Sequence, residues 1–239
     1  MPATRHDLRQ ADEMRSVKIT PHANHFAEGS CLVEFGLTKV LITASVEEQL
    51  PIFLRGGKKG WVTAEYAMLP RATLTRTERE KQLRDGRVKE IQRMIGRNLR
   101  AATNLSLLGE RQIKIDCDVL TADGGTRTAA LSGAWVALRL ACAGLQKKSI
   151  ITTMPLEYQV AGVSVALVDG KPLLDVNYKE DAAASLDSNF VIASDGKLLE
   201  LQLSAESSPF GDSDVMAMLQ LARKGAAVIF AAQIKAINT

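Results

Sequence analysis

Residues 115–128 read IDCDVLTADGGTRT, which predicts a strand, a tight glycine turn and the first turn of a helix. Every second residue from Ile113 to Val119 is apolar and the residues between them are charged, a period of two that is typical of a half-buried strand. Gly124 and Gly125 allow backbone angles that other residues resist. Residues 128–143 are apolar and rich in alanine and leucine, so we expect a buried helix there.

The start of this helix is a candidate anion site. Unpaired N–H groups and the positive end of the helix dipole face whatever lies in front of the first turn. Thr126 adds a hydroxyl donor, and Arg127 adds a planar fork of N–H groups that suits phosphate. Gly125, Thr126 and Arg127 are therefore predicted to bind inorganic phosphate or a phosphodiester. The alternative is an ordinary turn beside a solvated arginine, and the turn alone favours this alternative, because glycine-rich turns at helix starts are common.

The composition is that of a soluble globular protein, with 46% hydrophobic and 24% charged residues. The sequence shows no apolar run close to the ~20 residues of a membrane helix, and its first residues lack the apolar core of a signal peptide. The histidines form no Ser/His/Asp or HExxH pattern, which argues against nucleophilic catalysis by a side chain. The cysteines lie far apart in apolar segments and are interpreted as reduced core residues of a cytoplasmic protein: Cys31, Cys117 and Cys142.

Positive charge is concentrated in one part of the chain. Residues 71–100 hold ten lysine or arginine residues against four aspartate or glutamate residues, a net charge of +6. The whole chain carries +3, so the remainder sums to −3. A basic block on a slightly acidic protein indicates a polyanionic partner.

The first half is predicted to be mainly strands. Residues 1–15 are polar and are expected to extend over the surface or a neighbour. Apolar alternation predicts strands at 17–20, 31–35, 40–46 and 61–69, the second and third forming an antiparallel hairpin. Residues 70–84 have no period and are dense in arginine and threonine, which predicts an exposed, mobile loop.

A helix is expected at residues 87–103, with two different faces. One face is an apolar stripe of Ile91, Met94, Ile95 and Leu99. The other carries basic residues at spacings of four, four and three: Lys89, Arg93, Arg97 and Arg100. This basic face suits either a polyanion or plain solvation, and the sequence does not choose between them.

The second half repeats the order of strands and then a helix. Hairpins are predicted at 160–176 and 190–203, and a long helix at 214–237 with Asp212 or Ser213 as its cap. The polar residues Gln146-Lys147-Lys148 mark a boundary. The prediction is an α/β fold of mixed sheets and helices, in two packed halves at residues 1–148 and 149–239.

Two acids of the second half are candidate metal ligands. Asp181 and Asp187 flank a run of mostly small residues that lets the backbone bend closely, so both carboxylates are able to face one cavity. Two carboxylates, water and a phosphate oxygen are ligands that Mg²⁺ prefers. Taken alone, the two residues are better explained as ordinary loop acids.

Several longer motifs closely resemble the bacterial ribonuclease PH family. They are residues 60–66 (GWVTAEY), 68–73 (MLPRAT), 90–93 (EIQR) and 115–128. The similarity runs from about Arg5 to the C-terminal helix. The acidic segment also matches that family, at Asn177, Tyr178, Glu180, Asp181 and Asp187.

The resemblance implies a phosphate-dependent 3′→5′ exoribonuclease, or tRNA nucleotidyltransferase, which trims tRNA precursors and other structured RNA 3′ ends. Such an enzyme releases nucleoside diphosphates reversibly and uses Mg²⁺ or Mn²⁺ with inorganic phosphate as co-substrate. The resemblance also implies the fold of polynucleotide phosphorylase and exosome ring subunits, and a hexameric ring built as a trimer of dimers.

Site residues carry over by position. The resemblance assigns phosphate binding to Arg87, Gly125, Thr126 and Arg127. It assigns catalysis to Asp181, Asp187 and Arg127, with the two acids also holding the metal. It assigns RNA binding to the loop arginines Arg71, Arg76 and Arg79.

The sequence departs from the family pattern at several positions. At two positions where the family usually has glycine, this chain has Leu8 and Leu203. The other departures are Ser16, Val88-Lys89, Ser185-Leu186 and Ser188. None removes a charged group that the proposed chemistry needs, although changes near the acids bear on the metal pocket and turnover. Two other functions are weighed: a catalytically silent RNA-binding ring subunit, and a nuclease that uses water instead of phosphate.

Overall fold

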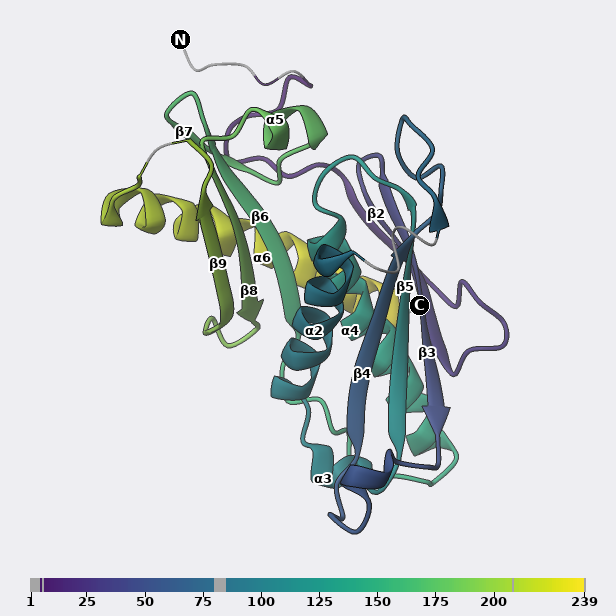
Figure 1. Ribbon diagram of the computed structural model, residues 1–239. Helices are drawn as coiled ribbons and strands as arrows, with labels where there is room; N and C mark the ends of the chain where they lie inside the picture. Colours follow the sequence, from purple (N-terminus) through teal and green to yellow (C-terminus); the bar gives the residue numbers. More distant parts are fainter. Residues whose placement is uncertain (1–4, 6, 80–84, 208, 239) are drawn as a thin grey trace.

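The computed structural model describes residues 5, 7–79, 85–207 and 209–238 (Figure 1). In this part of the chain, one sheet has the strand order β1-β2-β3-β5-β4. Its neighbouring strands are antiparallel, except for the parallel pair β4 and β5. The strands are β1 (Val17–Pro21), β2 (Gly29–Phe35), β3 (Thr38–Glu47), β4 (Trp61–Met68) and β5 (Gln112–Thr121).

A second, antiparallel sheet has the order β7-β6-β8-β9. Figure 1 shows it beside the first sheet, with α6 behind it. The strands are β6 (Val160–Val168), β7 (Lys171–Leu174), β8 (Leu186–Ala193) and β9 (Leu198–Ala205). The remaining elements are η1 (Ile52–Leu54), α2 (Gly86–Ala101), α3 (Leu105–Leu108), α4 (Thr126–Lys147), α5 (Tyr178–Ala182) and α6 (Asp212–Ile237). The predicted α/β class, with mixed sheets and helices, is confirmed.

The strand–turn–helix prediction at 115–128 is also confirmed. The four alternating apolar residues of β5 are at most 1% exposed: Ile113, Ile115, Cys117 and Val119. Helix α4 packs on β2 and β3 of the first sheet and on β6 of the second, so it joins the two layers. Its approach to β2 is so close that a Cβ atom at Gly29 would lie 2.0 Å from the carbonyl oxygen of Ala137. This contact requires glycine.

Both long helices extend beyond their predicted bounds. Helix α4 begins at Thr126 and ends at Lys147. The helical backbone hydrogen bonds continue beyond residue 143, where the apolar run used for the prediction ends. Helix α6 begins at Asp212 with Gly211 as its N-cap, so the predicted caps Asp212 and Ser213 are wrong. No side chain in the described part of the chain caps the first N–H groups of the helix; instead, the Asp214 carboxylate accepts a hydrogen bond from the N–H of Gly211 itself, at 3.0 Å.

Within the described residues, two helices have the length and apolar composition of a membrane span, by those properties alone: α4 and α6. This differs from the sequence expectation that no apolar run approaches that length. In α4, 78% of the most apolar window is buried within the protein, as expected of a core helix; in α6 the share is 28%.

Helix α2 has the predicted apolar stripe, since Ile91, Met94, Ile95 and Leu99 are at most 2% exposed. On its basic face, two arginines contact other parts of the protein and two basic residues are exposed to solvent. The Arg100 guanidinium lies 4.2 Å from the centre of the Trp61 ring and donates to the carbonyl oxygen of Val62. Arg97 forms an ion pair with Glu200 of β9. Lys89 and Arg93 are exposed.

The N-terminal segment differs from its prediction as a polar surface extension. Arg5, Arg9 and Arg15 are 5%, 8% and 7% exposed. Arg5 donates from Nε and Nη2 to the two carboxylate oxygens of Glu180, at 2.7 and 2.6 Å. Charged side chains are buried only when they find partners, and these partners lie far away in the sequence.

The cysteine prediction is supported by burial. All three cysteines are free and buried. Burial raises the pKa of the Cys31 and Cys142 thiols to about 12. Such thiols remain protonated at neutral pH and react poorly.

Candidate active site

A left-handed turn separates β5 from α4. Gly124 and Gly125 have φ angles of 73° and 65°, and Gly125 is the N-cap of α4. A Cβ atom at Gly124 would lie 2.5 Å from the carbonyl oxygen of Val176, so space as well as backbone angle requires glycine there. The turn therefore places the first N–H groups of a 22-residue helix at its outer end.

The turn is held from behind by Arg15 and Thr38. The Arg15 guanidinium donates to the carbonyl oxygens of Asp123 and Gly124, and the Thr38 hydroxyl donates to the Gly124 oxygen at 2.6 Å. Arg15 is itself fixed by the buried carboxylate of Asp175, with Nε–Oδ2 and Nη2–Oδ1 distances of 2.9 and 2.7 Å. These contacts satisfy the carbonyl oxygens of Asp123 and Gly124, and the Asp123 N–H donates to the Thr38 hydroxyl at 2.9 Å, so the turn is fixed in place.

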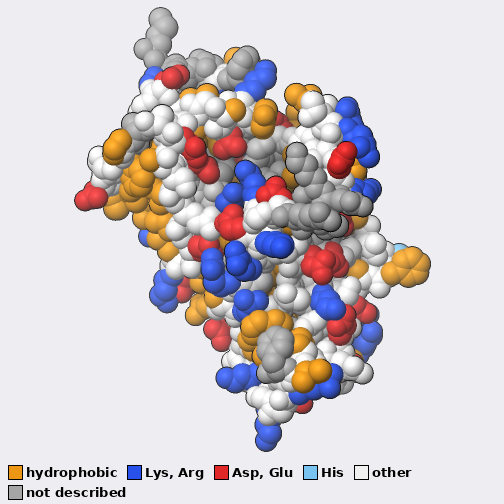
Figure 2. Space-filling view, viewed as in Figure 1, with side chains coloured by type: hydrophobic (Ala, Val, Ile, Leu, Met, Phe, Trp, Pro, Cys, Tyr) orange, Lys and Arg blue, Asp and Glu red, His pale blue; other side chains and the backbone are white. Residues whose placement is uncertain are grey.

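In front of the turn is a cavity of about 600 Å³. Side chains of both charges gather on this face between α2 and β9 (Figure 2). The cavity brings together residues of the turn, α2, α5 and β8. Among its lining residues are all four predicted phosphate residues and both predicted acids: Arg87, Gly125, Thr126, Arg127, Asp181 and Asp187.

The two acids reach the cavity from different elements. Asp181 lies on α5, which begins with a capping box between Asn177 and Glu180, and Asp187 lies on β8. Burial raises the pKa of both carboxyls, and the Asp181 charge raises that of Asp187 further. The charges of Arg87 and Arg127 act in the opposite direction, but burial outweighs them, so both pKa values remain above that of a free aspartate. The acids and the arginines therefore interact electrostatically across the cavity.

Family models match most of the chain. Residues 13–143 match domain 1 of the 3′ exoribonuclease family and residues 158–225 match domain 2. Proteins described as ribonuclease PH from Methylobacterium radiotolerans and Methylocella silvestris are 54% and 53% identical over 231 residues. Each alignment covers 96% of this chain and 98% of the relative.

The chain belongs to the ribonuclease PH family. Solved structures with the same fold include rice (Oryza sativa) Rrp46, with a TM-score of 0.80 and 16% identity, covering 98% of this chain and 100% of that one. An Archaeoglobus fulgidus exosome structure with RNA bound to its active site also gives 0.80, at 22% identity, covering 94% of this chain and 92% of that one. At these identities the likeness concerns the fold. The predicted exoribonuclease class of enzyme is confirmed by the family.

The loop arginines that the ribonuclease PH resemblance assigned to RNA lie outside this cavity. Arg71, Arg76 and Arg79 are exposed, and Arg71 donates to the carbonyl oxygen of Leu74. The same loop gives Thr73 and Thr77 to the cavity wall. Thr73 and Thr77 therefore face the cavity, whereas the three arginines are exposed outside it. The predicted loop residues Lys81 and Arg84 lie outside the described residues.

Several cavity residues were not singled out from the sequence. The Tyr66 hydroxyl is 2.8 Å from the Thr126 Oγ1, so it holds a predicted phosphate donor. Asn189 follows Asp187 on the same face of β8 and its amide lies 3.4 Å from that carboxylate. The remaining ones include Ser164 and Glu206. Asn189 could have been found from the sequence, because residues two apart on a strand point to the same face and Asn189 is two residues after Asp187. No local pattern in the sequence identifies Tyr66.

The donor set fits a hard divalent cation. Asp181, Asp187 and Glu206 supply carboxylate oxygens to the cavity, and Mg²⁺ and Mn²⁺ prefer oxygen ligands. Within the described residues, no three acidic, histidine or cysteine side chains come close enough to hold an ion by themselves. An ion here would need further oxygen ligands, such as water and the substrate phosphate.

Most of the residues that depart from the family pattern do not line the cavity. Val88 lines it, whereas Leu186, Ser188 and Leu203 are not among its lining residues. The Ser188 hydroxyl donates to the carbonyl oxygen of Val165, away from the acids. Leu8 has a φ angle of 66°, which costs a non-glycine residue about 1–2 kcal/mol and accounts for the usual glycine.

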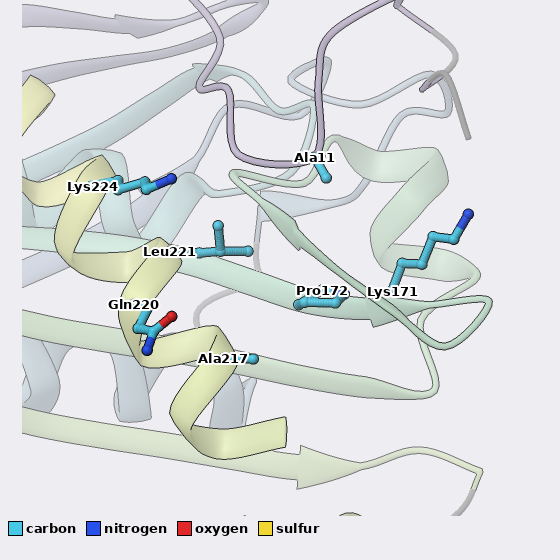
Figure 3. A pocket seen from close by; sticks show the side chains of 7 residues that line it. All are labelled: Ala11, Lys171, Pro172, Ala217, Gln220, Leu221 and Lys224. Atoms are coloured by element: carbon cyan, nitrogen blue, oxygen red, sulfur yellow. The ribbon is translucent and has the colours of Figure 1, made fainter. Parts of the chain in front are cut away.

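A second hollow, of about 360 Å³, lies between α6, β7 and the N-terminal segment (Figure 3). Its lysines are Lys171 and Lys224, and the Lys224 ammonium forms an ion pair with Asp12 at 2.9 Å. None of the predicted site residues lines it.

Removal of the Asp187 charge is expected to stabilise the fold at neutral pH. A carboxyl with a raised pKa binds protons more tightly in the folded state, so its stability contribution is full below the unfolded pKa and is lost as the pH rises through the folded pKa. Asp187→Asn should therefore raise the melting temperature at pH 7 and lose that advantage near pH 3.

The control is Asp195→Asn, because a hydrogen bond from Lys197 lowers the pKa of that exposed carboxyl. Its substitution should give no stabilisation at pH 7. Thermal unfolding followed by circular dichroism at both pH values measures the difference. An Asp187→Asn melting temperature at or below that of the parent at pH 7 would contradict the burial argument.

Proposed function

We propose that this protein is a phosphate-dependent 3′→5′ exoribonuclease that trims the 3′ ends of tRNA precursors and other structured RNAs. The observation that carries the proposal is the single cavity shared by the anion-binding turn and two acids from separate elements. The products are a nucleoside diphosphate and an RNA shortened by one nucleotide, and the reaction is reversible.

The phosphate side of the cavity supplies the attacking group. Arg87, Arg127, the Thr126 hydroxyl and the N–H groups at the start of α4 hold inorganic phosphate. One of its oxygens bonds to the last phosphodiester phosphorus, and the bond from that phosphorus to the preceding 3′ oxygen breaks. Two anions must approach each other, so positioning and neutralisation of charge carry the catalysis.

Asp181 and Asp187 are the proposed ligands of Mg²⁺ or Mn²⁺. When bound, such an ion neutralises charge on the phosphodiester and on the leaving oxygen. The raised pKa of each acid keeps it protonated to a higher pH than a free aspartate, so metal affinity should increase with pH through that range. Asn189 orients the Asp187 carboxylate.

The exposed arginines of the 70–79 segment are the proposed contacts to RNA phosphates. Phosphate contacts hold the substrate without reading its sequence. The block of positive charge at residues 71–100 supports this assignment. We also propose a cytoplasmic location, a division of the chain at 148/149 into two halves, and assembly into a hexamer as a trimer of dimers; light scattering after size exclusion tests the hexamer.

Arg76→Ala is expected to weaken tRNA binding and to reduce the slope of log K against log salt by about one unit, because one phosphate contact is lost. Arg223→Ala on the exposed side of α6 is the matched control and should leave the slope unchanged. Filter binding of a tRNA precursor at several salt concentrations measures both. A parental slope in Arg76→Ala would place the loop away from the RNA.

Chromatography of the products from a short RNA, with and without phosphate, tests the main proposal. Nucleoside diphosphate that requires added phosphate is the expected result. Monophosphate formed without phosphate would indicate hydrolysis, and no product would indicate a silent RNA-binding subunit. Either of these results overturns the proposed reaction.

A further inference from the structure

The guanidinium of Arg127 is held from behind by an amide. Its Nη1 donates to the Oε1 of Gln202 on β9, at 3.0 Å. The same nitrogen lies 3.7 Å from the Oε1 of Glu90 on α2. Arg127 is mostly buried, with a side-chain exposure of 15%. Two groups of different charge therefore compete for one edge of this guanidinium.

The other end of Gln202 is bound to acids. Its Nε2 donates to Glu90 Oε1 at 3.0 Å and to Glu200 Oε1 at 2.8 Å. An amide has one accepting end and one donating end, and carboxylates only accept. The two acids therefore require the NH₂ group, and the amide oxygen must face Arg127.

Glu200 is in turn fixed to α2. Its carboxylate accepts from Arg97 Nη2 at 2.5 Å and from Asn98 Nδ2 at 2.6 Å. The network thus runs from the surface of α2 across β9 to the turn at the start of α4. A side chain with both its donors and its acceptor engaged has one orientation and loses little more freedom on ligand binding.

We propose that Gln202 is a positioning residue for phosphate binding. It holds the Arg127 guanidinium toward the cavity and keeps Glu90 from closing on it. A neutral amide can orient an arginine without neutralising it, whereas a direct Glu90 pair would offset the charge that phosphate needs. This inference rests on the proposed function, in which Arg127 binds phosphate.

Three variants test the proposal: Gln202→Met, Glu90→Gln and the double variant. Methionine keeps the length of glutamine but has no amide to hold Glu90. Gln202→Met should raise the KM for phosphate about tenfold, the scale of one hydrogen bond to a charged group, and leave kcat within about twofold. Glu90→Gln removes the competing charge, so the double variant should return the KM to within about threefold of the parent.

Direct phosphate binding by calorimetry gives a second readout that does not depend on turnover. It should weaken in Gln202→Met and recover in the double variant. Gln202→Glu extends the series: it keeps an acceptor for Arg127 but adds a negative charge, so it should bind phosphate more weakly than Gln202→Met. Gln220→Met, on the exposed side of α6, is the matched control and should behave as the parent.

A parental KM and phosphate affinity in Gln202→Met would overturn the proposal, and so would a double variant as impaired as Gln202→Met. Circular dichroism melts of each variant show whether it is folded; if Gln202→Met does not fold, the comparison of Gln202→Glu with the parent decides. The parent is assayed first for phosphate-dependent release of diphosphate. Failure there refutes the proposed function itself, before any variant is compared.

Discussion

Arg127→Ala is expected to lower phosphate-dependent release of nucleoside diphosphates by about 10²–10³-fold, the usual cost of losing one main electrostatic donor. The reason is that Arg127 lines the cavity at the start of α4, together with Thr126. Initial rates on a short RNA over a range of phosphate concentrations measure the loss.

Two further variants separate charge from geometry. Arg127→Lys keeps the charge but not the planar fork of N–H groups, so it should recover only part of the activity. Arg223→Ala changes an exposed arginine on α6 and should be parental. Near-normal diphosphate release by folded Arg127→Ala would remove this residue from the reaction.

The sequence was most informative where its signals are local. The alternation from Ile113 to Val119 predicted β5, and the glycine pair predicted the tight turn before α4. Both follow from steric preferences of neighbouring residues. Grouping Arg87 with Arg127 and the two acids needed the family resemblance, because α2, α4, α5 and β8 meet only in the folded chain.

Long-range polar contacts were missed for the same reason. Arg15 and Asp175 are separated by 160 residues, and the polar character of residues 1–15 was interpreted as a surface property. Gln202 was treated as one position in a strand. Side-chain pairing across such distances leaves no periodic pattern, so hydropathy cannot distinguish a solvated arginine from a buried, paired one.

Arg15→Ala is expected to reduce the free energy of unfolding by about 3–5 kcal/mol, because it removes the closest charged partner of the buried Asp175 carboxylate and leaves only the Arg9 guanidinium, at 3.6 Å, as a charged partner among the described residues. Asp175 is 1% exposed and Arg15 is 7% exposed, so water cannot replace the lost contacts easily. The change also removes the Arg15 hydrogen bonds to the carbonyl oxygens of Asp123 and Gly124, although Thr38 still donates to the Gly124 oxygen. Activity should therefore fall even at temperatures where the variant remains folded.

Urea unfolding of Arg15→Ala, Asp175→Asn and the combination Arg15→Met with Asp175→Asn tests this view. The combination leaves no unpaired charge, so it should recover stability relative to Arg15→Ala but not activity, since the turn still lacks its donor. Lys197→Ala, which breaks the exposed Lys197–Asp195 pair, should change stability little. A loss below about 1 kcal/mol in Arg15→Ala would mean that the turn is held by Thr38 and the glycine geometry instead.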